Sequence, residues 1–232
     1  MEQTRSFGAR PRETTTAPGL TERLSRLRLY VITAADETPE QALETVRAAC
    51  DAGAGAVQLR RKCEDARITV RLAERCREIV GSGPTLLIVN DRLDIAMAAG
   101  ADGVHLGQDD LPLAAARRLW PQGLVGRSTH SLSQAMAAQA EGSDYIGVGP
   151  VWATPTKPGR PAVGLELVRS VAAAGLRIPW VAIGGVDAGS VAEVLHAGAR
   201  AVAVVRAVST AADPRTAIQT LHAAVHASGA AA

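Results

Sequence analysis

The chain has 232 residues, of which 47% are hydrophobic and 21% are charged, and its formal net charge is +2. This composition suits an ordinary globular protein, because it holds enough apolar residues for a core and excludes a disordered chain or a dedicated nucleic-acid binder. Only 3% of the residues are aromatic, which disfavours a stacking surface for single-stranded nucleic acid, so no nucleic-acid partner is expected.

The first 26 residues differ from the rest of the chain. They carry five arginines and two prolines, and they lack an apolar stretch that could act as a signal peptide. We expect a mobile N-terminal tail over 1–26, with a short helix near Leu20 to Leu27. The three cysteines, Cys50, Cys63 and Cys76, form no CxxC pair, which indicates reduced thiols in a cytoplasmic protein. No run of eighteen apolar residues occurs, so no membrane span is expected.

From residue 27 the chain alternates between short apolar runs and longer Ala-rich stretches with helical spacing. Continuous apolar runs are typical of strands that are buried on both faces, and repeated strand–helix units indicate a parallel sheet. The run starts are 17 to 35 residues apart, which is room for one βα unit each. The eight runs are Leu29 to Thr33, Ala56 to Arg60, Leu86 to Asn90, Gly103 to Gly107, Leu124 to Ser128, Tyr145 to Gly149, Trp180 to Gly184 and Ala201 to Val205.

Helix-boundary signals support this segmentation. Thr38-Pro39 followed by Gln41 offers an N-cap, a proline in the first turn and a capping box. Asp213-Pro214 repeats the start signal for the last helix, and Ala-Gly-Ala at 52–54, 99–101 and 197–199 ends three helices. Eight units in about 200 residues predict a single (β/α)8 TIM barrel over 27–228, a typical size for that fold. The rival fold is a doubly wound open sheet, which shares the alternation.

Polar residues gather where the predicted strands end, which is the face of a parallel barrel that carries chemistry. The cations Arg60, Lys62 and Lys157 follow different strands and would meet over one barrel mouth, as a phosphate site requires. Asp91 and Asp110 follow neighbouring strands, and two carboxylates bridged by substrate phosphates are a usual way to hold Mg²⁺. Each aspartate could instead cap a helix.

A second phosphate site is predicted after the seventh and eighth strands. Barrels commonly bind a phosphate there on backbone N–H groups, and Gly184-Gly185 would allow a close backbone approach. Two phosphate sites, one of them metal-assisted, suggest two phosphorylated small-molecule substrates.

These residues stand in motifs that resemble the thiamine-phosphate synthase family, also called thiamine-phosphate pyrophosphorylases, over roughly residues 27–225. The motifs occur in the family's order and are specific when taken together. They are Gln58-Leu59-Arg60-Arg61-Lys62, Val89-Asn90-Asp91, Gly103-Val104-His105-Leu106-Gly107-Gln108-Asp109-Asp110, Gly126-Arg127-Ser128-Thr129-His130, Thr154-Pro155-Thr156-Lys157 and Ala182-Ile183-Gly184-Gly185-Val186.

The resemblance implies a transferase that joins an aminopyrimidine diphosphate to a thiazole phosphate, giving thiamine phosphate and pyrophosphate. It implies Asp91 and Asp110 as Mg²⁺ ligands. It also implies Arg60, Lys62, Lys157 and Ser128 as catalytic residues. The implied diphosphate site comprises Gln58, Arg60, Lys62, Asn90, Ser128 and Lys157, and we count Leu59 and Arg61 of the same motif among the substrate-binding residues. The implied thiazole phosphate site comprises Thr154, Pro155, Thr156 and Gly185 with the backbone at Val205-Arg206.

Two positions depart from the family pattern. Arg61 stands where the family usually has Glu, and Arg206 stands where the last strand usually ends in a hydroxyl residue. Arg206 either adds a charged contact to the phosphate or points away from it. The resemblance leaves the preferred form of the thiazole open, and a monomer and a homo-oligomer are both compatible with the sequence.

The predicted mouth shows no activated nucleophile. Cys63 lacks a histidine at a suitable spacing, and His105 and His130 suit structural roles. We therefore hypothesise that the enzyme ionises its substrate and stabilises the departing diphosphate by electrostatics. The alternatives are a thiazole tautomerase-like relative, a non-catalytic sensor of phosphate ligands, and another phosphate-handling barrel.

Overall fold

The computed structural model describes residues 18–62, 65–156, 159 and 161–227, and within them eight parallel strands close into a barrel. Neighbouring strands pair in chain order, and the last pairs with the first, with Leu29 opposite Val202. This closure confirms the predicted barrel and excludes the open sheet. The strands are β1 (Leu29–Ile32), β2 (Ala56–Leu59), β3 (Leu86–Asn90), β4 (Gly103–Leu106), β5 (Leu124–Thr129), β6 (Tyr145–Val148), β7 (Trp180–Ile183) and β8 (Val202–Val204).

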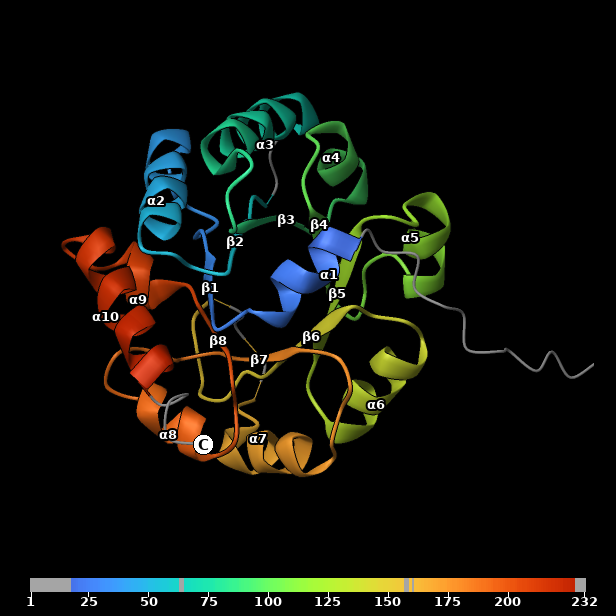
Figure 1. Cartoon of the computed structure of the whole chain (residues 1–232), viewed down its shortest axis with the longest axis vertical. Coiled ribbons are helices and arrows are strands. Elements are labelled where there is room, and N and C mark those ends of the chain that lie inside the picture. Colours follow the sequence, from blue (N-terminus) through green and yellow to red (C-terminus); the bar gives the residue numbers. More distant parts are fainter. Residues whose placement is uncertain (1–17, 63–64, 157–158, 160, 228–232) are drawn as a thin grey trace, which may run out of the picture.

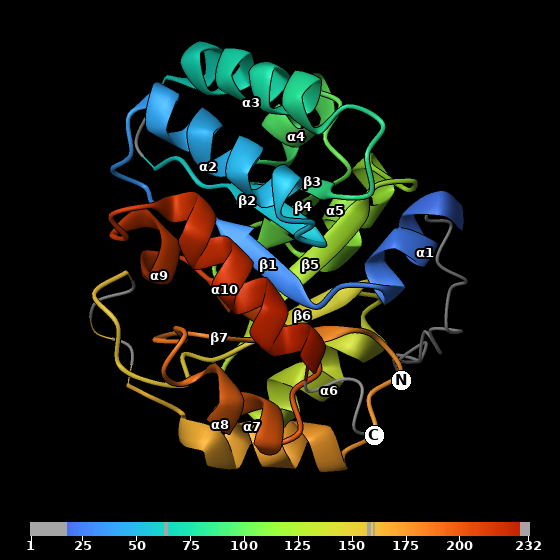
Figure 2. The same ribbon diagram turned by 60° about the vertical axis from the view of Figure 1, so that its left-hand side comes forward.

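Helices form a ring around this barrel, as Figure 1 shows. They are α2 (Pro39–Asp51), α3 (Ala66–Val80), α4 (Leu93–Ala98), α5 (Leu113–Leu119), α6 (Leu132–Ala140), α7 (Gly164–Ala173), α8 (Val191–His196), α9 (Arg206–Ser209) and α10 (Pro214–Ala227), preceded by α1 (Pro18–Ser25). Figure 2 shows α10 and α2 side by side along the barrel wall. Within the described ranges, none of the helices combines the length and the hydrophobicity that a membrane crossing needs.

The residues predicted to mark the ends of helix α2 do so in the structure. Thr38 Oγ1 accepts a hydrogen bond from Gln41 N at 3.2 Å while Gln41 Oε1 accepts one from Thr38 N at 2.8 Å, which is a complete capping box. Gly53 lies two residues after the end of α2 with φ 75°, a left-handed conformation that glycine adopts without strain. The chain therefore turns from each such helix into the next strand within a few residues.

Alternating strand residues divide the core into two parts. In β1, Tyr30 and Ile32 point into the barrel and belong to an inner cluster, whereas Leu29 and Val31 face the helices and belong to an outer cluster. The strands are therefore buried on both faces, which explains why they read as continuous apolar runs in the sequence. The inner cluster also contains Leu24 and Leu27, which precede the first strand.

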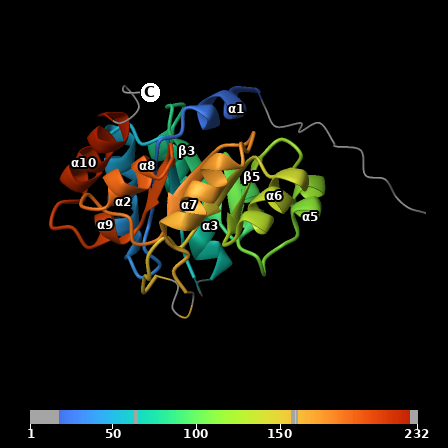
Figure 3. The same ribbon diagram turned by 90° about the horizontal axis from the view of Figure 1, so that it is seen from below.

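Helix α1 covers the end of the barrel where the strands begin. Figure 3 shows it opposite the end that carries the loop around residues 151–156. Arg23 Nη1 lies 3.2 Å from Asp102 Oδ1, and this carboxylate is shared with Arg77 at 3.1 Å. The predicted helix in this region is thus present. The packing shows no break between residues 26 and 27, where the tail was expected to end, and the rest of that expected tail, residues 1–17, lies outside the described residues.

The packing of α1 predicts that Leu24→Ala lowers the free energy of unfolding by about 2 to 5 kcal/mol, because it leaves a cavity in the inner core. Leu24 is 4% exposed, whereas Leu119 on α5 is 60% exposed and provides the matched control. Leu119→Ala is expected to change stability by less than about 0.5 kcal/mol. Urea denaturation of both variants measures the difference, and equal small losses would show that α1 contributes nothing to the core.

Candidate active site

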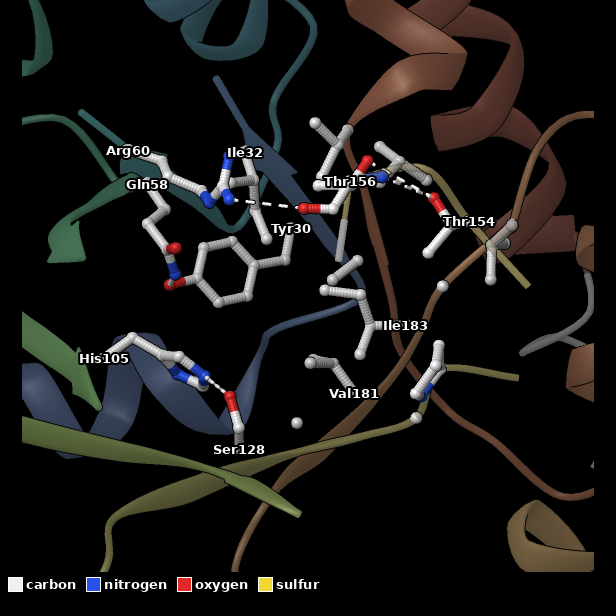
Figure 4. Close-up of a pocket in the computed structure, with 18 of the residues that line it drawn as sticks. Tyr30, Ile32, Gln58, Arg60, His105, Ser128, Thr154, Thr156, Val181 and Ile183 are labelled. Carbon is white, nitrogen blue, oxygen red and sulfur yellow. Dashed lines mark hydrogen bonds between the residues drawn. The ribbon is translucent and has the colours of Figure 1, made fainter. Parts of the chain in front are cut away.

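A pocket opens at the end of the barrel where the strands finish (Figure 4). Its inner wall is apolar and includes Ile32, Val181 and Ile183. Its polar groups come from strands and loops far apart in the sequence, which barrel closure brings to one rim. Among the polar lining residues are Gln58, Arg60, Asn90, Ser128, Thr154 and Thr156. The structure thus brings these polar residues, which the sequence assigned to the two phosphate sites, to one pocket.

Arg60 is the most constrained charge in this pocket. It is 8% exposed, its backbone N donates to Thr33 Oγ1 at 2.9 Å, and its Nη2 donates to Thr156 O at 3.4 Å. Burial lowers the pKa of the guanidinium, while Asp91 and Asp36 act against this shift. A buried guanidinium bonded to a neutral carbonyl still favours an anion, so this side chain suits a phosphate or diphosphate ligand.

Asn90 sits between this pocket and a second recess. It lines both, and its buried Nδ2 atom has no hydrogen-bond partner among the described residues. A buried amide donor without a partner costs free energy unless a ligand accepts its hydrogen bond. Asn90 Nδ2 can thus donate a hydrogen bond to a ligand atom in the pocket or in the second recess.

The second recess holds the remaining charged residues of the first motif. Lys62 Nζ lies 3.6 Å from Asp91 Oδ2, and Arg61, Arg92 and Leu59 line the same recess. Arg61 also donates through Nη1 to the backbone carbonyl of Glu37. From Gln58 to Arg61 the residues of this motif line the pocket and the recess in turn, since side chains at a strand end alternate in direction, and Lys62 then joins Arg61 in the recess.

Asp91 and Asp110 each lie ahead of a helix without being its N-cap residue. The N-cap residues of α4 and α5 are Arg92 and Pro112, and neither makes a side-chain bond to its helix in the described structure. Asp91 has φ 61°, and its backbone N donates to His105 O at 2.9 Å, which ties it to the neighbouring strand β4. Asp110 Oδ2 accepts from Gly107 N at 2.6 Å at the end of that strand.

These two carboxylates fit a hard divalent ion in donor chemistry. Both supply oxygen ligands, and together with phosphate oxygens and waters such pairs hold Mg²⁺. The described residues contain no group of three or more His, Cys, Asp or Glu side chains arranged around a metal, so a transition-metal centre has no support there.

Residues of the other predicted phosphate site line the same pocket. Gly184 and Gly185 have φ 103° and 72°, and both line the pocket with Val205. A Cβ atom on Gly185 would lie 2.8 Å from Trp152 Cβ, so a side chain does not fit there. Arg206 begins α9, is exposed and does not line the pocket, so of the two orientations considered it points away.

Pro155 is exposed and does not contribute to the lining, and the predicted residue Lys157 lies outside the described residues. Conversely, sequence reasoning did not select Tyr30 or His130, which line the pocket, and it treated His105 as a core residue. His130 Nδ1 donates to Gly149 O at 2.5 Å, in agreement with the structural role expected for it. The position of Tyr30 could have been predicted in part, because its strand β1 pairs with β2, the strand that leads into the Gln58–Lys62 motif.

Comparisons with known proteins agree with one another. The family model for thiamine monophosphate synthase matches residues 29–208. A thiamine-phosphate synthase of Mycolicibacterium vanbaalenii is 46% identical over 216 residues, which cover 89% of this chain and 98% of the relative. One of Gloeobacter violaceus is 49% identical over 202 residues, which cover 87% of this chain and only 58% of the relative. The solved thiamine phosphate pyrophosphorylase from Pyrococcus furiosus has a TM-score of 0.81 at 36% identity, covering 90% of this chain and 98% of that structure.

The packing of Tyr145 in the barrel interior depends on a glycine. A Cβ atom on Gly126 would lie 2.2 Å from Cζ of the Tyr145 ring, so Gly126→Ala is expected to push this ring aside and cost about 1 to 3 kcal/mol of stability. Gly19, around which a Cβ would meet no atom within 4 Å, is the matched control. Denaturant unfolding of Gly126→Ala and Gly19→Ala checks this, and equal stabilities would contradict the close packing.

Proposed function

The chain belongs to the thiamine monophosphate synthase family, and on that premise we propose that it couples 4-amino-2-methyl-5-(diphosphooxymethyl)pyrimidine with a thiazole phosphate. The products are thiamine phosphate and pyrophosphate, and with the carboxylated thiazole carbon dioxide is released as well. The enzyme is a transferase with small-molecule substrates and a cytoplasmic location, and it needs no nucleic-acid partner.

The single observation that carries this proposal is that one pocket brings together two sets of groups that suit phosphate. Arg60, Asn90 and Ser128 form one set, and Thr154, Thr156 and Gly185 of the other set line the same cavity. A coupling enzyme requires this arrangement, because it must hold two phosphorylated molecules with their reacting atoms a few ångströms apart.

Mg²⁺ is the cofactor in this proposal, and Asp91 and Asp110 would hold it. When bound, the ion would neutralise charge that develops on the departing diphosphate. The support is the donor set: two carboxylates that follow the neighbouring strands β3 and β4, one of them 3.6 Å from the Lys62 ammonium group that would share the same anion. Asn90 lines the recess of Asp91 and the main pocket alike, so one ligand can extend across both.

The protein's own residues then act by electrostatics. Arg60, Lys62, Lys157 and Ser128 stabilise the diphosphate as its bond to the pyrimidine methylene breaks and the bonding electrons leave with the oxygen. The aminopyrimidine delocalises the positive charge, and the thiazole nitrogen forms the new bond to the methylene carbon. In support, the described lining includes no cysteine, and its buried Arg60 guanidinium is a fixed cation of the kind that stabilises a leaving anion.

The thiazole phosphate is assigned to the second set of residues. Thr154, Pro155 and Thr156 with the backbone at Gly185 and Val205-Arg206 would anchor it, and the apolar wall of Ile183 and Val181 would exclude water from the cation. This anchoring lets the thiazole nitrogen capture the cation before water does.

The direct test mixes both phosphorylated precursors with Mg²⁺ and measures thiamine phosphate and pyrophosphate. We expect equal amounts of the two products, and neither product when one precursor is left out. A tautomerase would convert the thiazole phosphate without releasing pyrophosphate. A sensor would bind the precursors in calorimetry and release none either, so either result would refute the synthase function.

The metal assignment predicts that Asp91→Asn and Asp110→Asn lower kcat about 100-fold or more, because charge on the leaving group loses its counter-ion. EDTA is expected to abolish the activity of the unaltered enzyme, and excess Mg²⁺ to restore it. Asp94→Asn is the control, since this neighbouring carboxylate is 66% exposed and pairs with Arg92 at 2.5 Å. Full activity in EDTA would show that the two aspartates are not metal ligands.

A further inference from the structure

A continuous row of buried hydrogen bonds crosses the barrel interior. Gln58 Nε2 lies 2.7 Å from the Tyr30 hydroxyl, which lies 3.0 Å from the Tyr145 hydroxyl. The Tyr145 hydroxyl lies 3.2 Å from His105 Nδ1, and His105 Nε2 lies 3.0 Å from Ser128 Oγ. Figure 4 shows Gln58 beside Tyr30 and His105 beside Ser128. The row therefore joins two of the proposed substrate-binding residues, Gln58 and Ser128, through three residues with no assigned role.

The proton count gives this row a direction. Gln58 Nε2 can only donate, so the Tyr30 oxygen accepts there. The Tyr30 hydroxyl is buried and its other hydrogen-bond partner is Tyr145, so its single proton is satisfied by going to Tyr145. The Tyr145 oxygen accepts in turn, so its proton goes to His105 Nδ1. A neutral imidazole that accepts at Nδ1 carries its proton on Nε2, and this N–H donates to Ser128 Oγ.

The direction leaves the last hydroxyl with one free proton. In the described structure, Ser128 Oγ has His105 as its side-chain partner and lines the pocket. Since the serine oxygen accepts from His105, its own O–H is available to donate toward the ligand.

We propose that this row fixes His105 as a neutral Nε2–H donor and thereby holds the Ser128 hydroxyl as a hydrogen-bond donor to the departing diphosphate. Tyr30, Tyr145 and His105 are positioning residues for the transfer reaction, because they act through Ser128 and Gln58. The role at the diphosphate rests on the proposed synthase function, whereas the direction of the row does not.

Burial supports the assignment. Tyr30 and Tyr145 are each 1% exposed, and burial raises the pKa of both phenols far above the ordinary value, so both keep the protons that the row requires. The tyrosine rings meet edge to face, with centroids 5.9 Å apart, which restricts both hydroxyls to this geometry.

Nitrogen-15 NMR of the histidine rings tests the direction in the unaltered enzyme. The chain has five histidines, and the His105 signals are those that disappear in His105→Asn. We expect a single neutral tautomer with the proton on Nε2. A proton on Nδ1 would mean that the row runs from Ser128 to Gln58, which would overturn the proposal.

A double-mutant cycle tests whether the row acts through Ser128. Tyr145→Phe removes the donor to His105 Nδ1, so we expect the His105 signals to average over both tautomers and kcat to fall about 10- to 100-fold through lost positioning. Ser128→Ala is expected to lower kcat as much while His105 keeps its Nε2 proton. In the double variant, Tyr145→Phe should cost less than twofold beyond Ser128→Ala, whereas multiplied losses would show an independent structural role.

Ser143→Ala is the matched control. Its buried hydroxyl donates to Val125 O at 3.1 Å and to Tyr145 O at 2.7 Å, outside the row. This variant is expected to lower thermal stability without changing kcat or the His105 tautomer. If Tyr145→Phe does not fold, the spectra of the unaltered enzyme and of Ser128→Ala still decide the direction. If the unaltered enzyme makes no thiamine phosphate, the synthase function fails while the spectra still test the row.

Discussion

A polar side chain enclosed by this barrel has to find its partner inside the barrel, because water is excluded there and an unpaired group is costly. Gln58, Tyr30, Tyr145, His105 and Ser128 meet this requirement by bonding to one another. A continuous row of hydrogen bonds has few alternative arrangements, so each side chain in it is held in one orientation. The polar lining of the pocket takes its geometry from this constraint.

The charged groups obey a related constraint at the rim. Arg60 is buried against a backbone carbonyl, whereas Lys62 and Asp91 remain partly exposed and pair at 3.6 Å. Only the first of these charges is deprived of water, so it favours an anionic ligand most strongly. The more exposed pair can separate at small cost when a ligand or an ion arrives. The rim therefore combines one fixed cation with groups that can rearrange.

Much of the fold could be predicted from the sequence because each strand is buried on both faces. The apolar runs that became β1 to β8 stand out for that reason, and the Thr38 capping box and Gly53 mark the ends of α2 by local chemistry. The residues at the strand ends could be predicted as well, since barrel closure brings all such ends to one rim.

The interior row could not be predicted, because the sequence does not reveal which alternate residues of an apolar run point inward. Tyr30 and Tyr145 are 115 residues apart, and only the closed register brings their hydroxyls together. The same alternation separates the first motif, since Gln58 and Arg60 line the pocket while Leu59 and Arg61 line the neighbouring recess. The direction of Arg206 followed from the turn into α9, which sequence spacing does not specify.

Helix α1 gives the barrel a closed base, because Leu24 and Leu27 fill the end opposite the pocket. The barrel is thus closed at one end and open at the other. Substrates and products must pass through the same opening, so the product has to leave before the next pair of substrates can bind. Product release through this opening is then part of the catalytic cycle.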